Sequence, residues 1–528
     1  MNRHYKMLQN GSDIRGIALT GIKGELPNLG QEDAEYLSAG FLLWLSKKTG
    51  KAPKDLTISI GFDPRLSAKY LLHGLLNGMV PYGCTIRNCG LASTPAMFMS
   101  TVFPEFRCDG AIMITASHLP FNRNGFKFFD GDGGLNKKDI SQIIAYAESD
   151  EELKALGDRV GEENFSMVLG RKTYHSVPTD LMNVYCDFLK DKIKVGVNHP
   201  TLYNRPLEGL KIVVDAGNGG GGFYATKVLA PLGANISNSQ FLEPDGTFPN
   251  HAPNPEDKDA MHSLCMQVLT TQSDLGLIFD TDVDRSSAVD KRGREISRNG
   301  IVAMAAALVA EDFPGTTVVT DSITSDQLTV FLEEKLGLVH NRFQRGYKNV
   351  INEAIRLNNE GIDCQLAIET SGHAALKENY FLDDGAYLAT KIVIKAAKLR
   401  LEDKTLDSMI ADLEEPLEAV EIRLPIVAEA FSDYGNRVLA DFESWVTAES
   451  THQGMRLVTP NYEGIRIQFD ASNGDGWCLL RKSLHDPIMP LNIESNSKGG
   501  CKLIAAKLKG FLANYDQLNL AALLKMID

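Results

Sequence analysis

The stretch TISIGFDPRLSAKYLLHGLL, at residues 57–76, decides the fold, because it reads as a short strand, a turn and a helix in succession. Ser67 stands where a side chain can cap the helix, and the leucines that follow are spaced for one helical face. Two later stretches share the pattern: LKIVVDAGNGGGGFYATKVLAPLG at 210–233 and TTVVTDSITSDQLTVFLEEKLG at 316–337, where Ser325 is the expected cap. Strands that alternate with helices in this way predict mixed or parallel sheets covered by helices.

The three similar stretches predict three similar mixed-sheet α/β domains. The C-terminal part differs, because strand-like runs such as GIRIQFD (464–470) and GWCLLRK (476–482) follow one another before a helical run at 498–515. That order predicts a C-terminal α+β domain. The charged stretch 401–419 has a helical pattern, and Pro416 within it marks a boundary. We expect domains at 1–205, 206–305, 306–414 and 415–528.

The composition excludes several classes of partner. The chain has 68 Asp and Glu against 54 Lys and Arg, which gives a net charge of −14. Such a balance argues against binding to nucleic acid or to an anionic membrane, since both need a basic face. The N-terminus lacks the apolar run of a signal peptide, and apolar runs such as FLLWL at 41–45 are too short to span a bilayer. The eight cysteines are scattered without CxxC spacing, so we expect buried thiols and a cytoplasmic protein.

The first chemically informative segment is GAIMITASHLPFNRNGFKFF at 110–129. Ser117 comes at the end of an apolar strand, where α/β sheets place their ligands. A serine hydroxyl needs a base or a cation to become a nucleophile, and His118 and Lys127 on the same segment are candidates. A turn serine beside a surface histidine accounts for the local composition equally well.

The second segment is SDLGLIFDTDVDRSSAVD at 273–290, in which Asp280, Asp282 and Asp284 alternate directly after an apolar strand. If the chain stays extended, the three carboxylates point the same way. Converging carboxylates repel one another unless a cation lies among them, and oxygen ligands suit Mg²⁺. Arg285 could then steer a phosphate. A solvated acidic turn is the alternative, and the buried strand that leads into the loop favours the metal.

Two further segments carry weaker signals. In CQLAIETSGHAAL at 364–376, Glu369 and Ser371 suit a pair of sugar hydroxyls, although a turn with a helix cap fits equally. In WCLLRKSLHDPIMPLNIES at 477–495, Arg481, Ser483 and His485 alternate at the end of a strand. They could face one phosphate, but a solvated strand end is the simpler interpretation of that segment alone.

Together, and in this order, these segments resemble the α-D-phosphohexomutases, the family of phosphoglucomutases, phosphomannomutases and phosphoglucosamine mutases. TASHLPFNRNGFK looks like the phosphoserine loop of that family, DTDVDR like its metal loop and ETSGH like its sugar loop. PDGTFPNHAPNPE at 244–256 looks like a further hallmark, and GSDIRG at 11–16 supplies Arg15. The resemblance covers nearly the whole chain. It implies the three α/β domains and the α+β domain arranged around a central cleft.

The resemblance also implies roles for individual residues. Ser117 would carry the phosphoryl group, and one Mg²⁺ per chain would be held by a phosphoserine oxygen with the side chains of Asp280, Asp282 and Asp284. The residues that match positions around the transferring group are Arg15, His118 and Lys127. Lys127 would be a candidate for proton transfer, with its pKa lowered by neighbouring cations. The residues that would bind substrate are Arg285, Lys348, Glu369, Ser371, His373, Arg481, Ser483 and His485.

The implied function is the interconversion of hexose 1-phosphate and hexose 6-phosphate, of glucose, of mannose or of both. The reaction would pass through phosphoserine and a hexose 1,6-bisphosphate, which would also serve as activator. The expected partner is a phosphosugar, with no nucleic acid and no membrane, and the oligomeric state is unknown. One departure stands out: the usual Arg-x-Ser-Gly/Asn-Thr-Glu-Pro is here RKSLHDP at 481–487. A glucose 1,6-bisphosphate synthase that uses fructose 1,6-bisphosphate as donor is therefore an alternative.

Two other hypotheses stay open on the sequence alone. In a phosphatase of the haloacid-dehalogenase type, the strand before Asp280 and Asp282 would present an aspartate nucleophile, with Asp383 and Asp384 as a distal metal pair. That hypothesis leaves the TASH and GSDIRG segments unexplained. A non-catalytic sugar-phosphate sensor on the same fold is the other. The presence of Ser117, Lys127 and the three aspartates argues against it.

Overall fold

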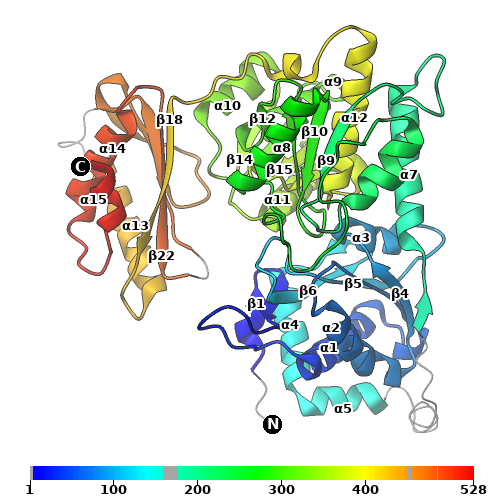
Figure 1. Cartoon of the computed structure of the whole chain (residues 1–528). Coiled ribbons are helices and arrows are strands. Elements are labelled where there is room, and N and C mark those ends of the chain that lie inside the picture. The colour runs from blue at the N-terminus through cyan, green and yellow to red at the C-terminus, as the bar shows by residue number, and fades with distance from the viewer. Residues whose placement is uncertain (1–3, 159–175, 449–453, 484–485, 528) are drawn as a thin grey trace. The chain divides into compact units, whose positions relative to one another are not determined.

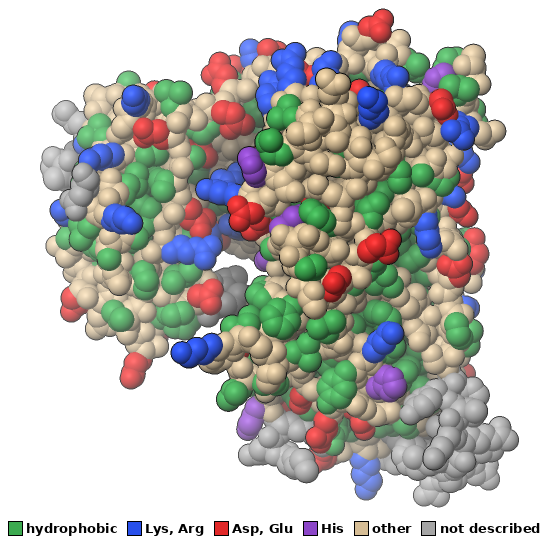
Figure 2. Space-filling view, viewed as in Figure 1, with side chains coloured by type: hydrophobic (Ala, Val, Ile, Leu, Met, Phe, Trp, Pro, Cys, Tyr) green, Lys and Arg blue, Asp and Glu red, His purple; other side chains and the backbone are tan. Residues whose placement is uncertain are grey.

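The computed structural model describes residues 4–158, 176–448, 454–483 and 486–527. The chain divides into two compact units: unit 1 is Met1–Leu308 with Ser371–Ile410, and unit 2 is Val309–Thr370 with Ala411–Asp528. In the described ranges, no helix is both long and apolar enough to cross a membrane. Figure 2 shows acidic and basic side chains interspersed over the face that it draws.

A mixed sheet forms the N-terminal part of unit 1, in the order β1-β2-β6-β5-β3-β4-β8, with β7 paired to β6 (Figure 1). Its strands are β1 Gln9–Asn10, β2 Asp13–Ile17, β3 Thr57–Phe62, β4 Thr85–Leu91, β5 Gly110–Ile114, β6 Arg123–Asp130, β7 Gly133–Gly134 and β8 Ser176–Pro178. β3 and β5 run parallel, with Phe62 opposite Ile114 at their carboxyl ends. The loops that follow these two strands therefore leave the sheet at the same edge.

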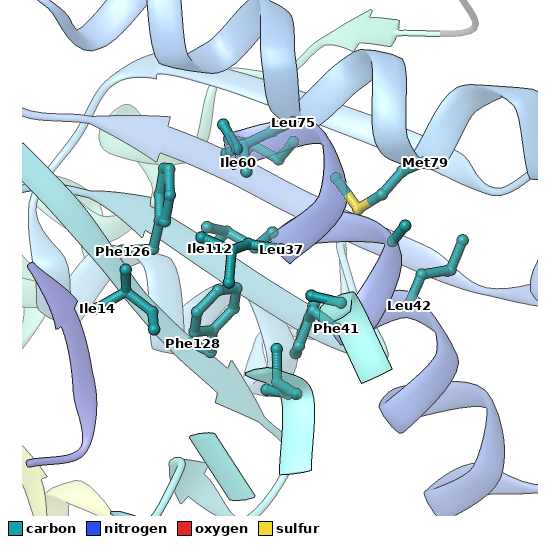
Figure 3. Close-up of a cluster of buried hydrophobic side chains, with 14 of the residues drawn as sticks. Ile14, Leu37, Phe41, Leu42, Ile60, Leu75, Met79, Ile112, Phe126 and Phe128 are labelled. Carbon is teal, nitrogen blue, oxygen red and sulfur yellow. The ribbon is translucent and has the colours of Figure 1, made fainter. Parts of the chain in front are cut away.

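Helices cover both faces of this sheet. They are α1 Gln31–Thr49, α2 Ala68–Met79, α3 Thr94–Val102, α4 Lys137–Glu148 and α5 Asp150–Asp158. Figure 3 shows Phe126, Phe128 and Ile112 of the sheet meeting side chains of α1 and α2, and Figure 1 shows α3 on the other side of the sheet. Ser67 precedes α2 as predicted, but it makes no side-chain cap; its hydroxyl accepts a hydrogen bond from Asn124 instead.

The rest of unit 1 builds the second α/β layer. Its sheet has the order β12-β11-β10-β9, in which β9 and β10 are parallel and β11 is antiparallel to β10. The strands of this sheet are β9 Ile212–Asp215, β10 Leu275–Phe279, β11 Ser286–Asp290 and β12 Glu295–Ile296. This part also contains the hairpin of β16 Ala374–Leu376 and β17 Leu382–Asp383. Its helices include α7 Leu181–Val197, α8 Lys258–Thr271 and α12 Gly385–Leu401. A helix, α9 at Asn299–Asp312, ends this part and leads into unit 2.

Unit 2 contains parallel strands and an antiparallel sheet. The parallel strands are β13 Thr317–Thr320, β14 Val339–Arg342 and β15 Cys364–Ile368, with α10 Asp326–Val330 and α11 Tyr347–Asn359 between them. The antiparallel sheet has the order β18-β22-β21-β20-β19. Its strands and helices are β18 Glu418–Pro425, β19 Met455–Leu457, β20 Ile465–Phe469, β21 Gly476–Leu480, β22 Ile488–Ser495, α13 Phe431–Thr447, α14 Gly500–Leu512 and α15 Ala521–Ile527. Ser325 caps α10 as predicted, because its hydroxyl accepts from the Leu328 N–H at 3.0 Å.

Short segments connect these elements. The 3₁₀ and π segments are at Lys6–Leu8, Pro53–Asp55, Val80–Tyr82, Tyr224–Leu229, Ala230–Leu232, Phe331–Lys335, Lys377–Asn379, Leu406–Ile410 and Ala471–Asn473. All eight cysteines are buried, as expected.

The secondary structure corrects two expectations. The helical pattern at 401–419 is wrong: α12 ends at Leu401, and only the short turn Leu406–Ile410 follows before β18. Leu406, Ile410 and Leu413 have helical spacing, but only Leu406 of them is buried, so the stretch packs too little of that apolar face to hold a helix. The helix α13, between the first two strands of the C-terminal sheet, was not predicted. Its buried Tyr434, Val438, Phe442 and Val446 are spaced four apart, which is the signal that could have found it.

Candidate active site

Ser117 lies in the loop between β5 and β6, at the carboxyl edge of the first sheet. Its backbone is left-handed, with φ of 49°, and the residue is 6% exposed. A non-glycine residue in this region carries a strain of about 1–3 kcal/mol, which the surrounding contacts must offset. The Ser117 N–H donates to Thr115 Oγ1 at 2.8 Å, and its hydroxyl donates to Asp280 Oδ2 at 3.0 Å. The strained serine is therefore aimed at the acidic loop of the second layer.

The acidic loop follows β10, and its three aspartates converge as predicted. The side chains of Asp280, Asp282 and Asp284 are buried, and one oxygen of each lies within 4.8 Å of the others. The mechanism of convergence differs from the expected extended chain. Val283 has φ of 66°, and its N–H donates to the Asp280 carbonyl at 3.3 Å, so the loop is a tight turn. A left-handed β-branched residue is a genuine outlier, and this turn directs the acids to one side.

The carboxyl groups of Asp280 and Asp284 have pKa values shifted in opposite directions. Burial, together with the nearby Asp284, raises the pKa of Asp280 well above its ordinary value. Burial acts on Asp284 in the same direction, but Lys127, His373 and Arg285 outweigh it and hold the pKa of that carboxyl low. The opposite pKa shifts of Asp280 and Asp284 are expected for buried like charges without a shared cation.

Two oxygens of this loop show that the residues fit a divalent cation. Asp282 Oδ1 and Asp284 Oδ1 are buried and have no hydrogen-bond partner among the residues that the structure describes. A buried carboxylate oxygen without a partner is costly, and a bound cation relieves that cost. Oxygen donors of this kind suit Mg²⁺, which coordinates carboxylates and phosphate oxygens. The Asp280, Asp282 and Asp284 set is therefore a candidate Mg²⁺ site.

Thr94 positions one of these acids, and sequence reasoning missed it. Its hydroxyl donates to Asp282 Oδ2 at 2.5 Å, and its N–H donates to the Asp282 carbonyl at 2.8 Å. Thr94 begins α3, far from the acidic loop in sequence. No local signal distinguishes it from any other threonine at the start of a helix.

The two predicted cations of the first sheet lie on β6 and β2. Lys127 is buried, and its ammonium group contacts Asp282 Oδ2 at 3.0 Å and Asp284 Oδ2. Burial opposes its charge, but these carboxylates prevail and raise its pKa well above the ordinary value. The expected lowering by neighbouring cations is therefore wrong for this arrangement. Arg15 donates to the Thr115 carbonyl at 2.9 Å and to Asp13 Oδ2 at 2.7 Å, so it braces the serine loop.

His118 and Arg285 flank the hydroxyl of Ser117. His118 Nδ1 lies 3.3 Å from Ser117 Oγ. Burial, with Arg285 and Arg15 nearby, lowers the pKa of His118 to about 2, so the ring is neutral at pH 7. Arg285 is 1% exposed; its Nε donates to Asp280 Oδ2 at 3.0 Å and its Nη2 to Ser117 Oγ at 3.4 Å. A cation and a neutral imidazole thus face the same oxygen.

The segment 244–256 supports Arg285 from behind. Asn254 Oδ1 accepts from Arg285 Nη1 at 3.4 Å, and Glu256 Oε2 lies 3.5 Å from the same nitrogen. His251 anchors the segment, because its Nε2 lies 3.0 Å from Asp215 Oδ2 at the end of β9. The sequence showed this segment as a hallmark but did not reveal these contacts.

His373 and Ser371 belong to unit 1. His373 Nδ1 lies 2.5 Å from Asp383 Oδ2 and 3.9 Å from Asp284 Oδ1. Burial opposes its protonation, but Asp383 and Asp284 raise the pKa of His373 to about 9. The Ser371 hydroxyl is buried and has no hydrogen-bond partner within the described part of the chain.

The remaining predicted residues belong to unit 2. Glu369 Oε1 accepts from the N–H of Gly346, the residue that precedes α11, at 2.6 Å, and Lys348 lies in the first turn of that helix. Burial lowers the pKa of Arg481, whose Nε is buried with no hydrogen-bond partner in the described ranges. Ser483 Oγ accepts from the Asp486 N–H at 3.1 Å. His485 lies outside the described residues.

Unit 2 also holds an arginine that sequence reasoning missed. Arg345 directly precedes Gly346, and its N–H donates to Glu463 Oε2 at 3.1 Å. The structure thus assembles Ser117, His118, Lys127, Arg15, Arg285 and the acidic loop in unit 1. In unit 2 it sets Glu369 beside the start of α11.

Three family models match the chain in consecutive order. They are described as "Phosphoglucomutase/phosphomannomutase, alpha/beta/alpha" domain I, domain II and domain III, and they match residues 6–154, 183–293 and 297–417. Together with the antiparallel C-terminal sheet, they confirm the predicted fold class of three α/β domains and a C-terminal α+β domain.

Individual proteins are similar over most of their length. A phosphomannomutase/phosphoglucomutase of Pseudomonas putida is 26% identical over 465 residues, which cover 87% of this chain and 89% of that protein. A phosphoglucomutase of Neisseria gonorrhoeae is 26% identical over 508 residues, 96% of each chain. A crystal structure of a phosphoglucomutase/phosphomannomutase family protein from Burkholderia thailandensis shares the fold, with a TM-score of 0.73, 22% identity and coverage of 97% and 98%.

Proposed function

Because this chain belongs to the phosphoglucomutase/phosphomannomutase family and is an enzyme of the phosphohexomutase type, we propose that it interconverts hexose 1-phosphate and hexose 6-phosphate of glucose, of mannose or of both. The phosphoryl group would be carried on Ser117, and a hexose 1,6-bisphosphate would be the intermediate and the activator. Membership of this family excludes the hypothesis of a haloacid-dehalogenase-type phosphatase. Asp383, its supposed metal ligand, is paired with His373.

One observation carries the proposal: the Ser117 hydroxyl, held in a strained backbone, lies 3.0 Å from an oxygen of the acidic loop. A phosphoryl group on Ser117 Oγ would lie beside the acidic loop, in which Asp282 and Asp284 each have a buried oxygen with no hydrogen-bond partner among the described residues. When bound there, Mg²⁺ supplies charge neutralisation to the transferring group. Asp280, Asp282, Asp284 and a phosphoserine oxygen would hold the ion.

The protein's own residues account for the other requirements of the transfer. Phosphorus bonds to the oxygen of the free sugar hydroxyl as its bond to Ser117 Oγ breaks. The sugar hydroxyl gives up its proton, and Oγ, on which negative charge develops, takes up a proton to end as the serine hydroxyl. The guanidinium of Arg285, at 3.4 Å, faces that charge. Lys127 adds a second buried positive charge beside the acidic loop, and its part in proton transfer stays a prediction. Burial of Ser117 limits hydrolysis of the phosphoserine by water.

The substrate-binding residues remain proposals. We propose that the sugar hydroxyls bind Glu369 and Ser371, whose buried hydroxyl has no partner among the described residues. For the phosphate of the substrate we propose Arg481, since its guanidinium suits bidentate contact. The others proposed are Lys348, His373, Ser483 and His485. The domain boundaries and a cytoplasmic location stay predictions.

A bisphosphate synthase is the second candidate, and the loop at 481–487 favours it. Leu484, His485 and Asp486 stand where the family pattern has a small residue, Thr and Glu. Weaker retention of the bisphosphate would release it as product.

The deciding experiment supplies glucose 1-phosphate or mannose 1-phosphate with Mg²⁺ and a trace of the matching 1,6-bisphosphate, with and without fructose 1,6-bisphosphate, and follows the products by ³¹P NMR. The mutase predicts glucose 6-phosphate after a trace of glucose 1,6-bisphosphate. Accumulation of bisphosphate that depends on fructose 1,6-bisphosphate would identify the synthase. Absence of both products from glucose and mannose phosphates would refute the proposal.

A further inference from the structure

A buried ion pair outside the reacting groups connects the first strand–helix unit to the serine loop. Asp63 and Arg65, in the turn between β3 and α2, are 0% and 2% exposed. Arg65 Nε contacts Asp63 Oδ2 at 3.2 Å, and the Arg65 N–H donates to Asp63 Oδ1 at 3.1 Å. These two contacts fix the Arg65 guanidinium relative to the Asp63 carboxylate.

The guanidinium of Arg65 binds four carbonyls of the serine loop and its end. Nη1 donates to the carbonyls of Pro120, at 2.7 Å, and Arg123, at 3.1 Å. Nη2 donates to the carbonyl of Leu119 at 2.7 Å and to that of Ser117. An arginine has five N–H donors in a rigid planar fork, and with Nε on Asp63 all of them are used. A lysine has three donors on one nitrogen and cannot span these carbonyls.

Asp63 reaches the other side of Ser117 through Thr115. Thr115 Oγ1 donates to Asp63 Oδ2 at 2.7 Å and accepts from the Ser117 N–H at 2.8 Å. The peptide groups before and after Ser117 are thus both tied to a single ion pair. This is the residue whose backbone is left-handed.

The segment 244–256 closes over the pair. The Phe248 ring lies 5.2 Å from the Arg65 guanidinium carbon, and a Cβ at Gly246 would lie 2.3 Å from the Pro64 carbonyl oxygen. This segment also carries Asn254, which contacts Arg285. The ion pair therefore touches two of the loops that converge on Ser117 Oγ.

We propose that Asp63 and Arg65 are positioning residues that hold Ser117 in the left-handed conformation in which its hydroxyl faces the acidic loop. The inference rests on the proposed function of Ser117 as phosphoryl carrier. Neither residue contacts the transferring group. Their effect is on the alignment of Oγ, to which phosphoryl transfer is sensitive.

The test compares Arg65→Lys with Arg466→Lys. Arg466 is a matched control: it is fully buried, pairs with Asp326 at 2.9 Å, and donates to the carbonyls of Ser322 and Thr324 at 3.0 and 3.1 Å. Both substitutions keep the positive charge beside the partner aspartate, Asp63 or Asp326. We expect Arg65→Lys to lower kcat about 100-fold with little change in KM, and to lower the fraction of Ser117 that glucose 1,6-bisphosphate phosphorylates. Arg466→Lys should lower Tm but keep kcat and the phosphorylated fraction.

A second pair of variants decides the matter if Arg65→Lys does not fold. Thr115→Val removes the hydroxyl that joins Asp63 to the Ser117 N–H, while Thr115→Ser keeps it. The proposal requires a lower kcat for Thr115→Val and its recovery in Thr115→Ser, with KM unchanged in both. An equal kcat in this pair, or an equal loss in Arg65→Lys and Arg466→Lys, overturns it. Failure of the proposed function is distinguishable, because the unmodified enzyme would then show neither turnover nor phosphoserine at 117.

Discussion

Substitution of Thr94 by valine should weaken the cation site without touching a ligand. Thr94 is 3% exposed and Asp282 is 0% exposed, and the hydroxyl of the first donates to Oδ2 of the second at 2.5 Å. Valine has nearly the same shape, so the change removes the hydrogen bond without opening a cavity. Asp282 Oδ2 would then keep Lys127 Nζ, at 3.0 Å, while the backbone N–H of residue 94 would still hold the Asp282 carbonyl.

The magnitude follows from the charge on the acceptor. A hydrogen bond to a charged group is worth about 1.5–3 kcal/mol, and each 1.4 kcal/mol is about tenfold in affinity. Loss of the contact should therefore weaken Mg²⁺ binding about 10- to 100-fold, the range seen when a partner behind a metal ligand is removed. The same loss should lower the free energy of unfolding of the metal-free protein by about 1.5–3 kcal/mol.

The assay is a Mg²⁺ titration of mutase activity, with thermal unfolding measured in EDTA and in saturating Mg²⁺. Thr94→Ser, which keeps the hydroxyl, is the control and should titrate like the unmodified enzyme. A Thr94→Val protein that is folded and reaches half-maximal activity within about twofold of the normal Mg²⁺ concentration would refute the reasoning, because Asp282 would then need no support from α3.

Three further predictions concern stability and the cation. Burial raises the pKa of Asp384 to about 6, against about 3.9 in the unfolded chain. The stabilisation from this carboxyl is therefore full below about pH 4 and is lost as the pH rises to about 6, a loss of about 3 kcal/mol in the free energy of unfolding. Asp384→Asn should flatten that part of the stability profile in urea titrations, and an unchanged slope would contradict it. Leu42 is fully buried on α1 (Figure 3). Leu42→Ala should lower the free energy of unfolding by about 2–5 kcal/mol and leave kcat unchanged. A loss below about 1 kcal/mol would mean that this core is less tightly packed than the contacts indicate. Removal of divalent cations with EDTA should abolish turnover and lower Tm. Mg²⁺ at 100 times its Kd should then raise the free energy of unfolding by about 2.7 kcal/mol. A Tm that does not change with Mg²⁺ would argue against a site in the acidic loop.

The sequence predicted those parts of the site that depend on short-range pattern. A strand followed by DTDVDR was enough to predict converging acids, because any path of the chain that keeps Asp280, Asp282 and Asp284 together crowds their charges. The path itself was mispredicted. The left-handed Val283 turns the loop tightly, and nothing in the composition of a β-branched residue suggests such a conformation.

Contacts between distant segments could not be predicted from one sequence. Arg65 meets carbonyls that lie 52 to 58 residues later, and Thr94 meets Asp282 across 188 residues. Both sets of contacts form only when the chain has folded and β3, β5 and β10 lie in their sheets. The lowered pKa expected for Lys127 failed for the same reason, since its immediate neighbours are carboxylates supplied by the second layer.

The central claim is that Ser117 carries the phosphoryl group next to the acidic loop. It is tested most directly by incubating the enzyme with glucose 1,6-bisphosphate and Mg²⁺ and mapping the phosphate by peptide mass spectrometry, alongside Ser117→Ala. The account predicts acid-stable phosphate on Ser117, and neither phosphate nor turnover in the variant. Acid-labile phosphate on Asp280, or turnover that survives in Ser117→Ala, would contradict it.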